Sequence, residues 1–321
     1  MIGEYCGFTY LEMNQDINYA IKNVGLFKNG NITDAKWLMY YLDSPIGKHQ
    51  LKLRRSGTSQ PYISLGALRN LPILIPNTQD EKQQIVDTLS CLDEKIENLR
   101  KQNETLEAIA QTLFKHWFID FEFPNDDGKP YKSSGGEMVA SELGEIPKRW
   151  QVGKLGDVLT LNYGKSLTAN KRIEGKYPVI GSNGIIDFHK DFIVKAPGIV
   201  IGRKGTIGQV IWLEKDFYPI DTTFYVTDNL NSDGLYFYYF LLQNQNFMRL
   251  TSDSAVPGLN RDMAYSVEFA FSDIALINRF NHIIKNFISK KETNIQQIQT
   301  LRKTRDALLP KLMSGQIRVK E

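Results

Sequence analysis

The chain has 321 residues, of which 42% are hydrophobic and 23% are charged; this composition excludes a disordered or fibrous protein and supplies apolar side chains for about two domains. The two cysteines, Cys6 and Cys91, are far apart in the sequence, so we expect neither a disulfide framework nor a cysteine-based zinc site, and we expect a cytoplasmic location. The apolar runs are far shorter than the ~20 residues that cross a bilayer, so we expect no membrane-spanning segment and no membrane partner. A net charge of +3 is too small to identify a nucleic-acid partner by itself.

A first cluster of basic residues lies shortly before the first long helix. Its basic side chains are followed by hydroxyl side chains, in the order Lys48, Lys52, Arg54, Arg55, Ser56, Thr58 and Ser59. Lysine and arginine bind phosphates, and small polar side chains hydrogen-bond to phosphates or base edges. The cluster therefore predicts contact with nucleic acid, although solvated loop charges would give the same pattern.

A long helix is predicted over residues 79–118. Thr78 can cap its N-terminus, and Glu81 three residues later completes a capping box. The helix then carries residues at alternating steps of four and three, the spacing of a coiled-coil seam. The seam positions are Ile85, Leu89, Leu92, Ile96, Leu99, Asn103, Leu106, Ala110, Leu113 and Trp117. Asn103 is the polar member of this seam.

Residues 121–136 are rich in Pro, Gly, Asp and Ser and are expected to form a linker. After them, short β-branched and aromatic runs separated by glycine predict a strand-rich domain. The predicted strands are residues 158–161, 179–180, 199–201, 209–213 and 224–227. A helix is expected at residues 235–247, where the hydrophobic period becomes helical and a cluster of aromatic residues faces the core.

The coiled-coil spacing returns over residues 273–313. Its positions are Ile277, Phe280, Ile284, Phe287, Lys291, Asn294, Ile298, Leu301, Arg305, Leu308 and Leu312. The two long helices carry opposite net charges, −3 over residues 79–118 and +5 over residues 273–313, so we expect an intramolecular, antiparallel coiled coil. Asn103, Lys291 and Asn294 are expected at one level, fixing the register at a cost in stability, and replacing Asn103 with leucine is expected to raise the melting temperature. The alternative is that each helix packs on its own domain.

The chain contains an internal repeat. Residues 56–61 and 252–257 are similar at an offset of 196, each followed by a predicted strand and a long helix, and residues 37–53 match residues 235–250. The repeat divides the chain into six segments: a partial first domain at 1–77, a spacer helix at 78–118, a linker at 119–136, a complete second domain at 137–272, a second spacer helix at 273–313 and a tail at 314–321. The first domain lacks a counterpart of about residues 137–201.

No group of residues meets the requirements of a catalytic site. The segment Gly164-Lys165-Ser166 resembles the end of a phosphate-binding loop, but Leu159 stands where the first glycine is required. Gly202, Gly205 and Gly208 lie between two predicted strands and indicate a tight turn, and the four histidines have no metal-ligand spacing. We therefore expect no catalytic residue, metal or cofactor.

A second basic segment runs from residue 161 to residue 204. It has a net charge of +5 and is interrupted by glycines and small polar residues, a pattern typical of loops that bind DNA. The candidate residues are Lys165, Ser166, Lys171, Arg172, Ser182, Asn183, Arg203, Lys204 and Thr206, and Arg54, Arg55 and Thr58 are the candidates in the first domain.

Several motifs together resemble the specificity subunits of type I restriction-modification enzymes. They are Leu113-Phe-Lys-His-Trp117-Phe-Ile-Asp120-Phe, Gly144-Glu-Ile-Pro-Lys-Arg-Trp150 with Lys154-Leu-Gly-Asp157, Gly202-Arg-Lys-Gly205-Thr-Ile-Gly208, and Leu308-Leu-Pro-Lys-Leu312 with Ser314-Gly-Gln-Ile-Arg318. The resemblance covers nearly the whole chain from about residue 25 onward.

The resemblance implies an α+β fold, in which target recognition domains of mixed strand and helix type are joined by two long antiparallel coiled-coil helices. It implies a non-catalytic subunit that reads a bipartite site in double-stranded DNA through the candidate residues named above. Methyltransferase subunits, which carry the cofactor chemistry, and an endonuclease/translocase subunit are the implied partners.

The partial first domain departs from the family pattern, and we expect it to be truncated. A second specificity chain or another polypeptide is expected to supply the missing half. Two alternatives remain at this stage: a coiled-coil scaffold that binds no DNA, and an inactive, truncated specificity subunit.

Overall fold

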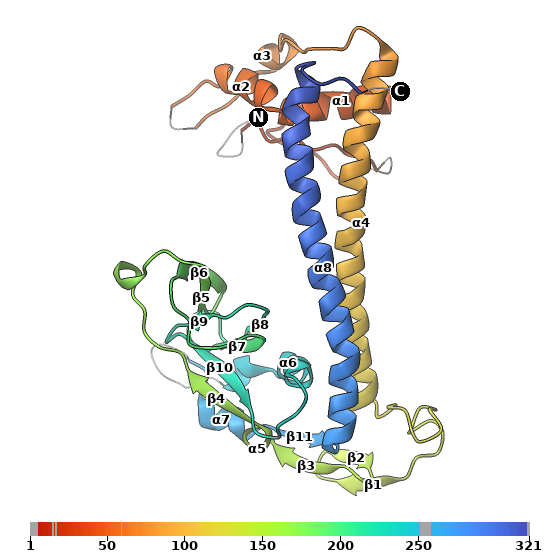
Figure 1. Ribbon diagram of the computed structural model, residues 1–321, viewed down its shortest axis with the longest axis vertical. Helices are drawn as coiled ribbons and strands as arrows, with labels where there is room; N and C mark the ends of the chain where they lie inside the picture. The colour runs from red at the N-terminus through yellow and green to blue at the C-terminus, as the bar shows by residue number, and fades with distance from the viewer. Residues whose placement is uncertain (1–5, 15, 17, 59, 251–257, 320–321) are drawn as a thin grey trace. The chain divides into compact units, whose positions relative to one another are not determined.

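The computed structural model describes residues 6–14, 16, 18–58, 60–250 and 258–319 (Figure 1). The chain divides into two compact units. Unit 1 comprises residues 1–103 and 292–321, and unit 2 comprises residues 104–291. Ser59 and the second segment of the predicted repeat, residues 252–257, lie outside the described residues.

Unit 1 is built from helices. They are α1 (Ile32–Asp43), α2 (Pro45–Leu53), α3 (Leu65–Arg69), the first part of α4 (Gln79–Phe118) and the last part of α8 (Ile274–Met313). The predicted cap of the first long helix is confirmed, because the Thr78 hydroxyl accepts a hydrogen bond from the Glu81 amide at 3.1 Å. Ser44 follows α1 as its C-cap and is also the N-cap of α2, where its hydroxyl accepts a hydrogen bond from the Gly47 amide at 3.1 Å.

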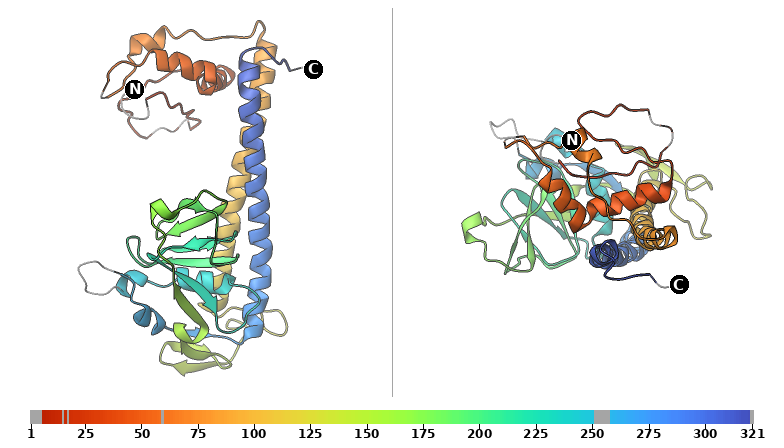
Figure 2. Two further views of the ribbon diagram at one scale, coloured as in Figure 1. Left: turned by 60° about the vertical axis from the view of Figure 1, so that its left-hand side comes forward. Right: turned by 90° about the horizontal axis from the view of Figure 1, so that it is seen from above.

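The core of unit 1 joins α1 to both long helices. Its apolar members include Trp37, Tyr40 and Tyr41 of α1, Ile85 and Leu89 of α4, and Leu309 and Leu312 of α8. Figure 2 shows α1 lying beside α4 and α8 in this unit. Three aromatic side chains of α1 are buried in this core, so burial of apolar area holds the three helices together.

The strand predicted before the first long helix is wrong. Described residues between 60 and 78 contain the short helix α3 and an extended segment, but no strand. The Tyr41 hydroxyl donates to the Pro72 carbonyl at 2.8 Å, and the Trp37 indole donates to the Leu74 carbonyl at 3.0 Å. Side chains of α1 therefore take the carbonyls that a neighbouring strand would otherwise bind, and the segment has no ladder partner among the described residues.

The two long helices are confirmed, and α4 and α8 have 40 residues each. In unit 1, Ile96 and Leu99 of α4 pack with Ile298 of α8, and Arg305 of α8 donates to Asp93 of α4 at 2.7 Å. The earlier residue of α4, Asp93, contacts the later residue of α8, Arg305, and the later residues of α4 contact Ile298, so the two helices run antiparallel.

The predicted polar positions of the seam meet within each unit. In unit 1, the Asn294 amide donates to the Asn103 side-chain carbonyl at 2.9 Å. In unit 2, Lys291 forms an ion pair with Glu107, one turn from the expected partner. Of the other expected seam positions, Leu92, Leu106, Phe287 and Leu301 are partly buried.

The Asn103–Asn294 contact changes the expected effect of the Asn103→Leu substitution. Asn294 is fully buried, and its own Oδ1 has no hydrogen-bond partner among the residues that the structure describes. The single variant removes the nearer of the two acceptors of the Asn294 amide, leaving Gln102 at 3.4 Å, and should lower the free energy of unfolding by about 1 kcal/mol. The double variant N103L/N294L removes both polar groups and should melt at a higher temperature than the wild type. Thermal melts followed by circular dichroism test both; a single variant that is more stable than the double one contradicts the contact.

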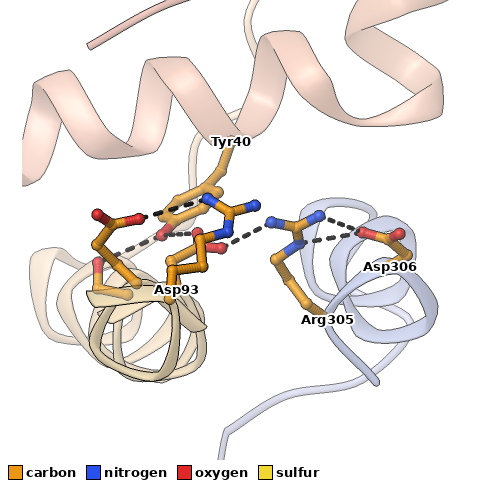
Figure 3. Close-up of polar contacts among 7 residues, drawn as sticks. Tyr40, Asp93, Arg305 and Asp306 are labelled. Carbon is orange, nitrogen blue, oxygen red and sulfur yellow. Dashed lines mark hydrogen bonds and ion pairs between the residues drawn. The ribbon is translucent and has the colours of Figure 1, made fainter. Parts of the chain in front are cut away.

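A polar cluster connects α1 to both long helices in unit 1 (Figure 3). The Tyr40 hydroxyl donates to Asp93 at 2.8 Å, and Arg305 binds Asp93 at 2.7 Å and Asp306 at 2.8 Å. Burial acts to lower the pKa of Arg305, but its hydrogen bonds to the two carboxylates outweigh burial and raise that pKa. Asp93 thus accepts donors from α1 and α8 at once.

Removing the Tyr40 hydroxyl should have a pH-dependent effect. Burial, with a further contribution from Asp93, raises the pKa of Tyr40 well above its usual value. The neutral hydroxyl therefore stabilises the fold fully below about pH 10, and this contribution is lost as the pH rises toward the folded-state pKa. Tyr40→Phe should cost about 1 kcal/mol near pH 8, and the difference from the wild type should shrink above about pH 10. Urea unfolding near pH 8 and above about pH 10 measures the difference in the free energy of unfolding between variant and wild type. Tyr62→Phe, at an exposed tyrosine, is the control. A difference that does not change with pH would contradict the role given to the cluster.

Unit 2 contains the sheets. The largest is four-stranded, antiparallel and ordered β4-β10-β7-β8, from β4 (Leu159–Tyr163), β10 (Thr223–Asp228), β7 (Gly198–Gly202) and β8 (Val210–Leu213). Beside it is a sheet ordered β6-β5-β9, from β6 (Gly184–His189), β5 (Tyr177–Gly181) and β9 (Tyr218–Pro219). Two pairs complete the unit: β1 (Met138–Ser141) with β2 (Gly144–Pro147), and β3 (Gln151–Lys154) with β11 (Glu268–Phe271).

Short helices connect these strands. They are α5 (Leu155–Val158), η1 (Ala169–Lys171), α6 (Tyr236–Gln243), η2 (Phe247–Leu250) and α7 (Arg261–Tyr265). All five predicted strands are confirmed as β4, β5, β7, β8 and β10. The helix expected at residues 235–247 is confirmed as α6 but ends at Gln243. Within the predicted linker, Phe121 and Phe123 contact the ring of Trp150 at 5.2 Å and 5.4 Å between centroids.

The core of unit 2 includes the ends of both long helices. Phe280 of α8 is fully buried, and its ring lies 5.2 Å from Phe118, 5.9 Å from Phe114 and 6.0 Å from Trp117 of α4. These rings also contact α6 through Phe240, 6.0 Å from Phe280. The helix ends are thereby packed into the same core that supports the sheets.

Candidate nucleic-acid interface

The C-terminal ends of β4 and β7 and the N-terminal ends of β8 and β10 meet at one edge of the four-stranded sheet. Phe224 of β10 pairs with Tyr163 at the end of β4, and Thr223 pairs with Gly202 at the end of β7. The loops that follow β4 and β7 and precede β10 therefore emerge together. We call the surface formed by residues 163–166, 182–183, 203–208 and 219–222 the loop surface.

Backbone hydrogen bonds hold the loop surface together. The Lys165 amide donates to the Pro219 carbonyl at 3.0 Å. The amides of Arg203 and Lys204 donate to the Thr222 carbonyl at 2.9 Å and 3.1 Å. Because segments distant in the sequence share these bonds, the side chains that they carry are placed relative to one another by the sheet.

The backbone requires glycine at several positions of the loop surface, and Gly164 and Gly205 show the two reasons. A Cβ at Gly164 would lie 2.1 Å from the carbonyl oxygen of Ile220, which no larger residue tolerates. Gly205 has a φ of 79°, a conformation that favours glycine in the predicted turn between β7 and β8. Gly164, which resembled part of a phosphate-binding loop in the sequence, is therefore explained by the close approach of two chain segments.

The structure brings several of the candidate residues together. Lys165, Lys204 and Thr206 are exposed on the loop surface, and Arg203 is partly exposed. Ser182 belongs to the same surface, because its hydroxyl would lie 3.2 Å from a Cβ at Gly205. Ser166 and Asn183 are also exposed on the loop surface, and Lys171 is exposed on η1 outside it.

Arg172 is held by other residues of its own unit. Its guanidinium forms an ion pair with Asp187 at 3.3 Å and donates to the Leu167 carbonyl at 3.3–3.4 Å. A backbone hydrogen bond from Phe188 and the bond from Arg172 lower the pKa of Asp187, so the carboxylate stays charged. This arrangement fixes the loop that contains η1 and leaves Arg172 less free to bind a phosphate.

The candidates of the first domain lie in unit 1. Arg54 ends α2 and donates to Gln50, at 3.0 Å to its backbone carbonyl and 2.7 Å to its side chain. Arg55 donates to the Cys6 carbonyl. Thr58 is exposed. The two arginines are thus engaged in contacts that stabilise unit 1.

The sequence analysis missed two residues here: Tyr163 of the loop surface, and Arg261 at the start of α7, which contacts the Tyr163 ring and is counted with the loop surface from this point. The guanidinium carbon of Arg203 lies 5.0 Å from the centre of the Tyr163 ring, and that of Arg261 also lies 5.0 Å from it. Nothing in the local sequence indicates this contact, because Tyr163 and Arg261 are almost a hundred residues apart. Leu259, two residues before Arg261 in the chain, donates its amide to the Arg203 carbonyl at 2.9 Å.

The electrostatics of the loop surface are mainly positive. Lys165, Arg203, Lys204 and Arg261 contribute the cations, and Asp221 is an exposed acidic residue in the same region. Among the described residues, no group of three or more His, Cys, Asp or Glu side chains is placed to hold a metal ion. No helix in the described part of the chain is long and apolar enough to cross a membrane. The arrangement suits an extended anionic ligand.

The sequence matches the family model of the type I restriction modification DNA specificity domain over residues 3–108 and 147–270. The type I restriction enzyme MjaIX specificity subunit of Methanocaldococcus jannaschii is 28% identical, over 95% of this chain and 73% of that protein. The HindI specificity subunit of Haemophilus influenzae is 25% identical, over 96% of this chain and 83% of that protein. The crystal structure of the S subunit of a type I restriction-modification system from M. genitalium has a similar fold, with a TM-score of 0.61 at 22% identity, and the match covers 87% of this chain and 72% of that one.

Proposed function

The chain belongs to the family of type I restriction modification DNA specificity domains, and we propose from this premise that it is the sequence-specific DNA-recognition subunit of a type I restriction-modification complex. It selects the target site in double-stranded DNA. It does not itself carry out catalysis.

The observation that carries this proposal is the loop surface. Loops from four strand ends converge there. They present four cationic side chains beside the hydroxyls of Ser182 and Thr206, and these cations are Lys165, Lys204, Arg203 and Arg261. Cationic side chains bind phosphates and supply affinity, whereas short polar side chains on rigid loops reach base edges. A surface that combines both on a fixed sheet edge suits sequence recognition.

We propose that the partners are methyltransferase subunits and an endonuclease/translocase subunit. The relatives are named as specificity subunits of type I restriction enzymes, which supports this assignment. In such an assembly, the chain directs catalytic subunits to a DNA site, and the methyl-donor chemistry belongs to the partner.

Selection from a randomised duplex library tests the function directly. The chain is assembled with the methyltransferase subunit of the same system, bound duplexes are recovered at moderate salt, and the enriched sequences are determined. A bipartite or palindromic motif is expected, and its affinity should fall steeply with salt, because counterions are released from each contacted phosphate. Formation of the protein complex without any enriched motif would identify a scaffold and overturn the proposal.

A further inference from the structure

We propose that Arg203 and Arg261, both stacked on Tyr163, form a clamp that binds the phosphate backbone of the DNA target. The inference rests on the proposed function and assigns a chemical role to two residues that the sequence did not single out. We call the three residues the Arg–Tyr–Arg clamp.

The clamp is assembled from three separate parts of unit 2. Tyr163 ends β4, Arg203 follows β7, and Arg261 begins α7. Both guanidinium carbons lie 5.0 Å from the centre of the Tyr163 ring, so they are no further apart than twice that distance. Arg203 also lies 5.8 Å from the Phe224 ring, and Arg261 lies 5.9 Å from the Tyr265 ring. Each arginine is therefore held by two aromatic rings.

Two guanidinium groups that share one ring, and so lie at most about 10 Å apart, concentrate positive charge in a way that favours an anion. Among the described residues, neither guanidinium has a carboxylate within ion-pair distance, unlike Arg172 and Arg305. The Nε of Arg261 is buried and has no hydrogen-bond partner in the described part of the chain. Orienting a charged side chain in this way, without a partner, costs free energy, and an anion bound at the exposed part of the pair offsets that cost.

A phosphate fits this pair better than a base edge does. Guanidinium groups carry permanent charge and a fixed fork of donors that matches phosphate oxygens. One arginine suffices to bind the neutral edge of a guanine, whereas two arginines match the negative charge of one phosphate or of two neighbouring ones. Aromatic stacking also fixes the side chains before binding, which lowers the entropic cost of the contact.

The position of the clamp links it to the rest of the loop surface. Lys204 follows Arg203 directly, and both residues bind the Thr222 carbonyl through their amides. The half-exposed ring of Tyr163, with 49% of its surface accessible, lies at the end of β4 just before Lys165. A phosphate held by the clamp would fix the DNA strand beside the polar side chains of the loops, which then read the bases.

Neutralising single phosphates provides the test. Duplexes that contain the selected target are made with one methylphosphonate at each backbone position in turn, and the affinity of the assembled complex is measured for each. We expect one or two adjacent positions at which neutralisation weakens wild-type binding about tenfold. Arg261→Ala should weaken binding to the unmodified duplex to a similar degree, and it should be insensitive to neutralisation at those same positions. Arg203→Ala should behave in the same way.

Controls separate the clamp from general effects of charge and folding. Arg279→Ala removes a guanidinium of α8 that lies 5.8 Å from the ring of Trp117 on α4, a matched cation–π contact outside the loop surface. This variant should keep the wild-type pattern of sensitivity to neutralised phosphates. Arg261→Lys keeps the positive charge but not the planar fork of donors. Its affinity for the duplex should lie between those of the wild type and Arg261→Ala, and the slope of the logarithm of affinity against the logarithm of salt concentration should be unchanged. This second variant decides the question if Arg261→Ala fails to fold by circular dichroism.

Three results would overturn the clamp. The first is equal affinity and salt dependence of Arg261→Ala and the wild type. The second is an Arg261→Ala variant that stays as sensitive as the wild type to every neutralised phosphate. The third is a relaxed base preference of this variant at one position of the target, which would identify Arg261 as a residue that reads a base. Absence of specific binding by the wild type instead refutes the proposed function, so the two failures are distinguishable.

Discussion

Replacing Lys165 and Lys204 together with alanine should lower the affinity of the assembled complex for its selected duplex by about 30-fold near 0.15 M salt, because each lost phosphate contact accounts for about fivefold there. Both lysines are exposed on the loop surface, and neither ammonium group stacks on a ring or pairs with a carboxylate among the described residues. Binding isotherms at several salt concentrations measure the change. The slope of the logarithm of affinity against the logarithm of salt should become shallower by about two.

The matched control uses two lysines at the open end of the hairpin formed by β7 and β8, whose turn contains Lys204. Lys195 precedes β7 and Lys215 follows β8, at the end opposite the turn that contains Lys204. Lys195→Ala with Lys215→Ala removes the same charge, yet it should leave both the affinity and the salt slope close to those of the wild type. Equal losses in the two double variants would show that net charge, and not the loop surface, governs binding. Assembly with the methyltransferase subunit should be unaffected in both.

Phe280→Ala should give the largest loss of stability. The Phe280 ring is fully buried and contacts Phe114, Trp117 and Phe118 of α4 and Phe240 of α6. Truncating a buried phenylalanine removes its transfer free energy and leaves a cavity, at a cost of about 3–5 kcal/mol. Urea unfolding monitored by tryptophan fluorescence measures the change, because Trp117 lies 6.0 Å from the removed ring.

Phe287→Ala is the control for this prediction. Phe287 lies on the same seam of α8, two seam positions after Phe280, and is partly buried. Its truncation exposes less apolar surface and should cost roughly half as much or less. If both variants lose the same stability, the contact of α8 with α4 resembles a uniform coiled coil, and the aromatic cluster adds nothing. The expected difference would show instead that the ends of α4 and α8 belong to the core of unit 2.

The helices and the strands of the sheet could be predicted from the sequence because their signals are local. Steps of four and three residues place one face of a helix against a partner, and Thr78 with Glu81 marks where α4 begins. Short β-branched runs between glycines located β4, β5, β7, β8 and β10. Opposite charges on the two long helices likewise predicted that they pair.

Local signals failed where a partner decides the outcome. The extended segment after α3 is not a strand, because side chains of α1 occupy its carbonyls. The sequence placed Asn103, Lys291 and Asn294 at one level, but the structure pairs Asn294 with Asn103 and Lys291 with Glu107. Which polar groups meet across a seam depends on register, and a shift of one turn changes every pair.

Periodicity, charge and short motifs were enough to predict the class of fold, the long helices and the family. Which candidate residues share a surface is visible only in the folded protein: Lys165, Ser182, Arg203 and Lys204 do, whereas Arg172 is bound to Asp187. The fold also adds Tyr163 and Arg261, which no local pattern indicates. The physical reason is that the loops are placed by hydrogen bonds between strands distant in the chain, and those pairings are set by the whole core of unit 2.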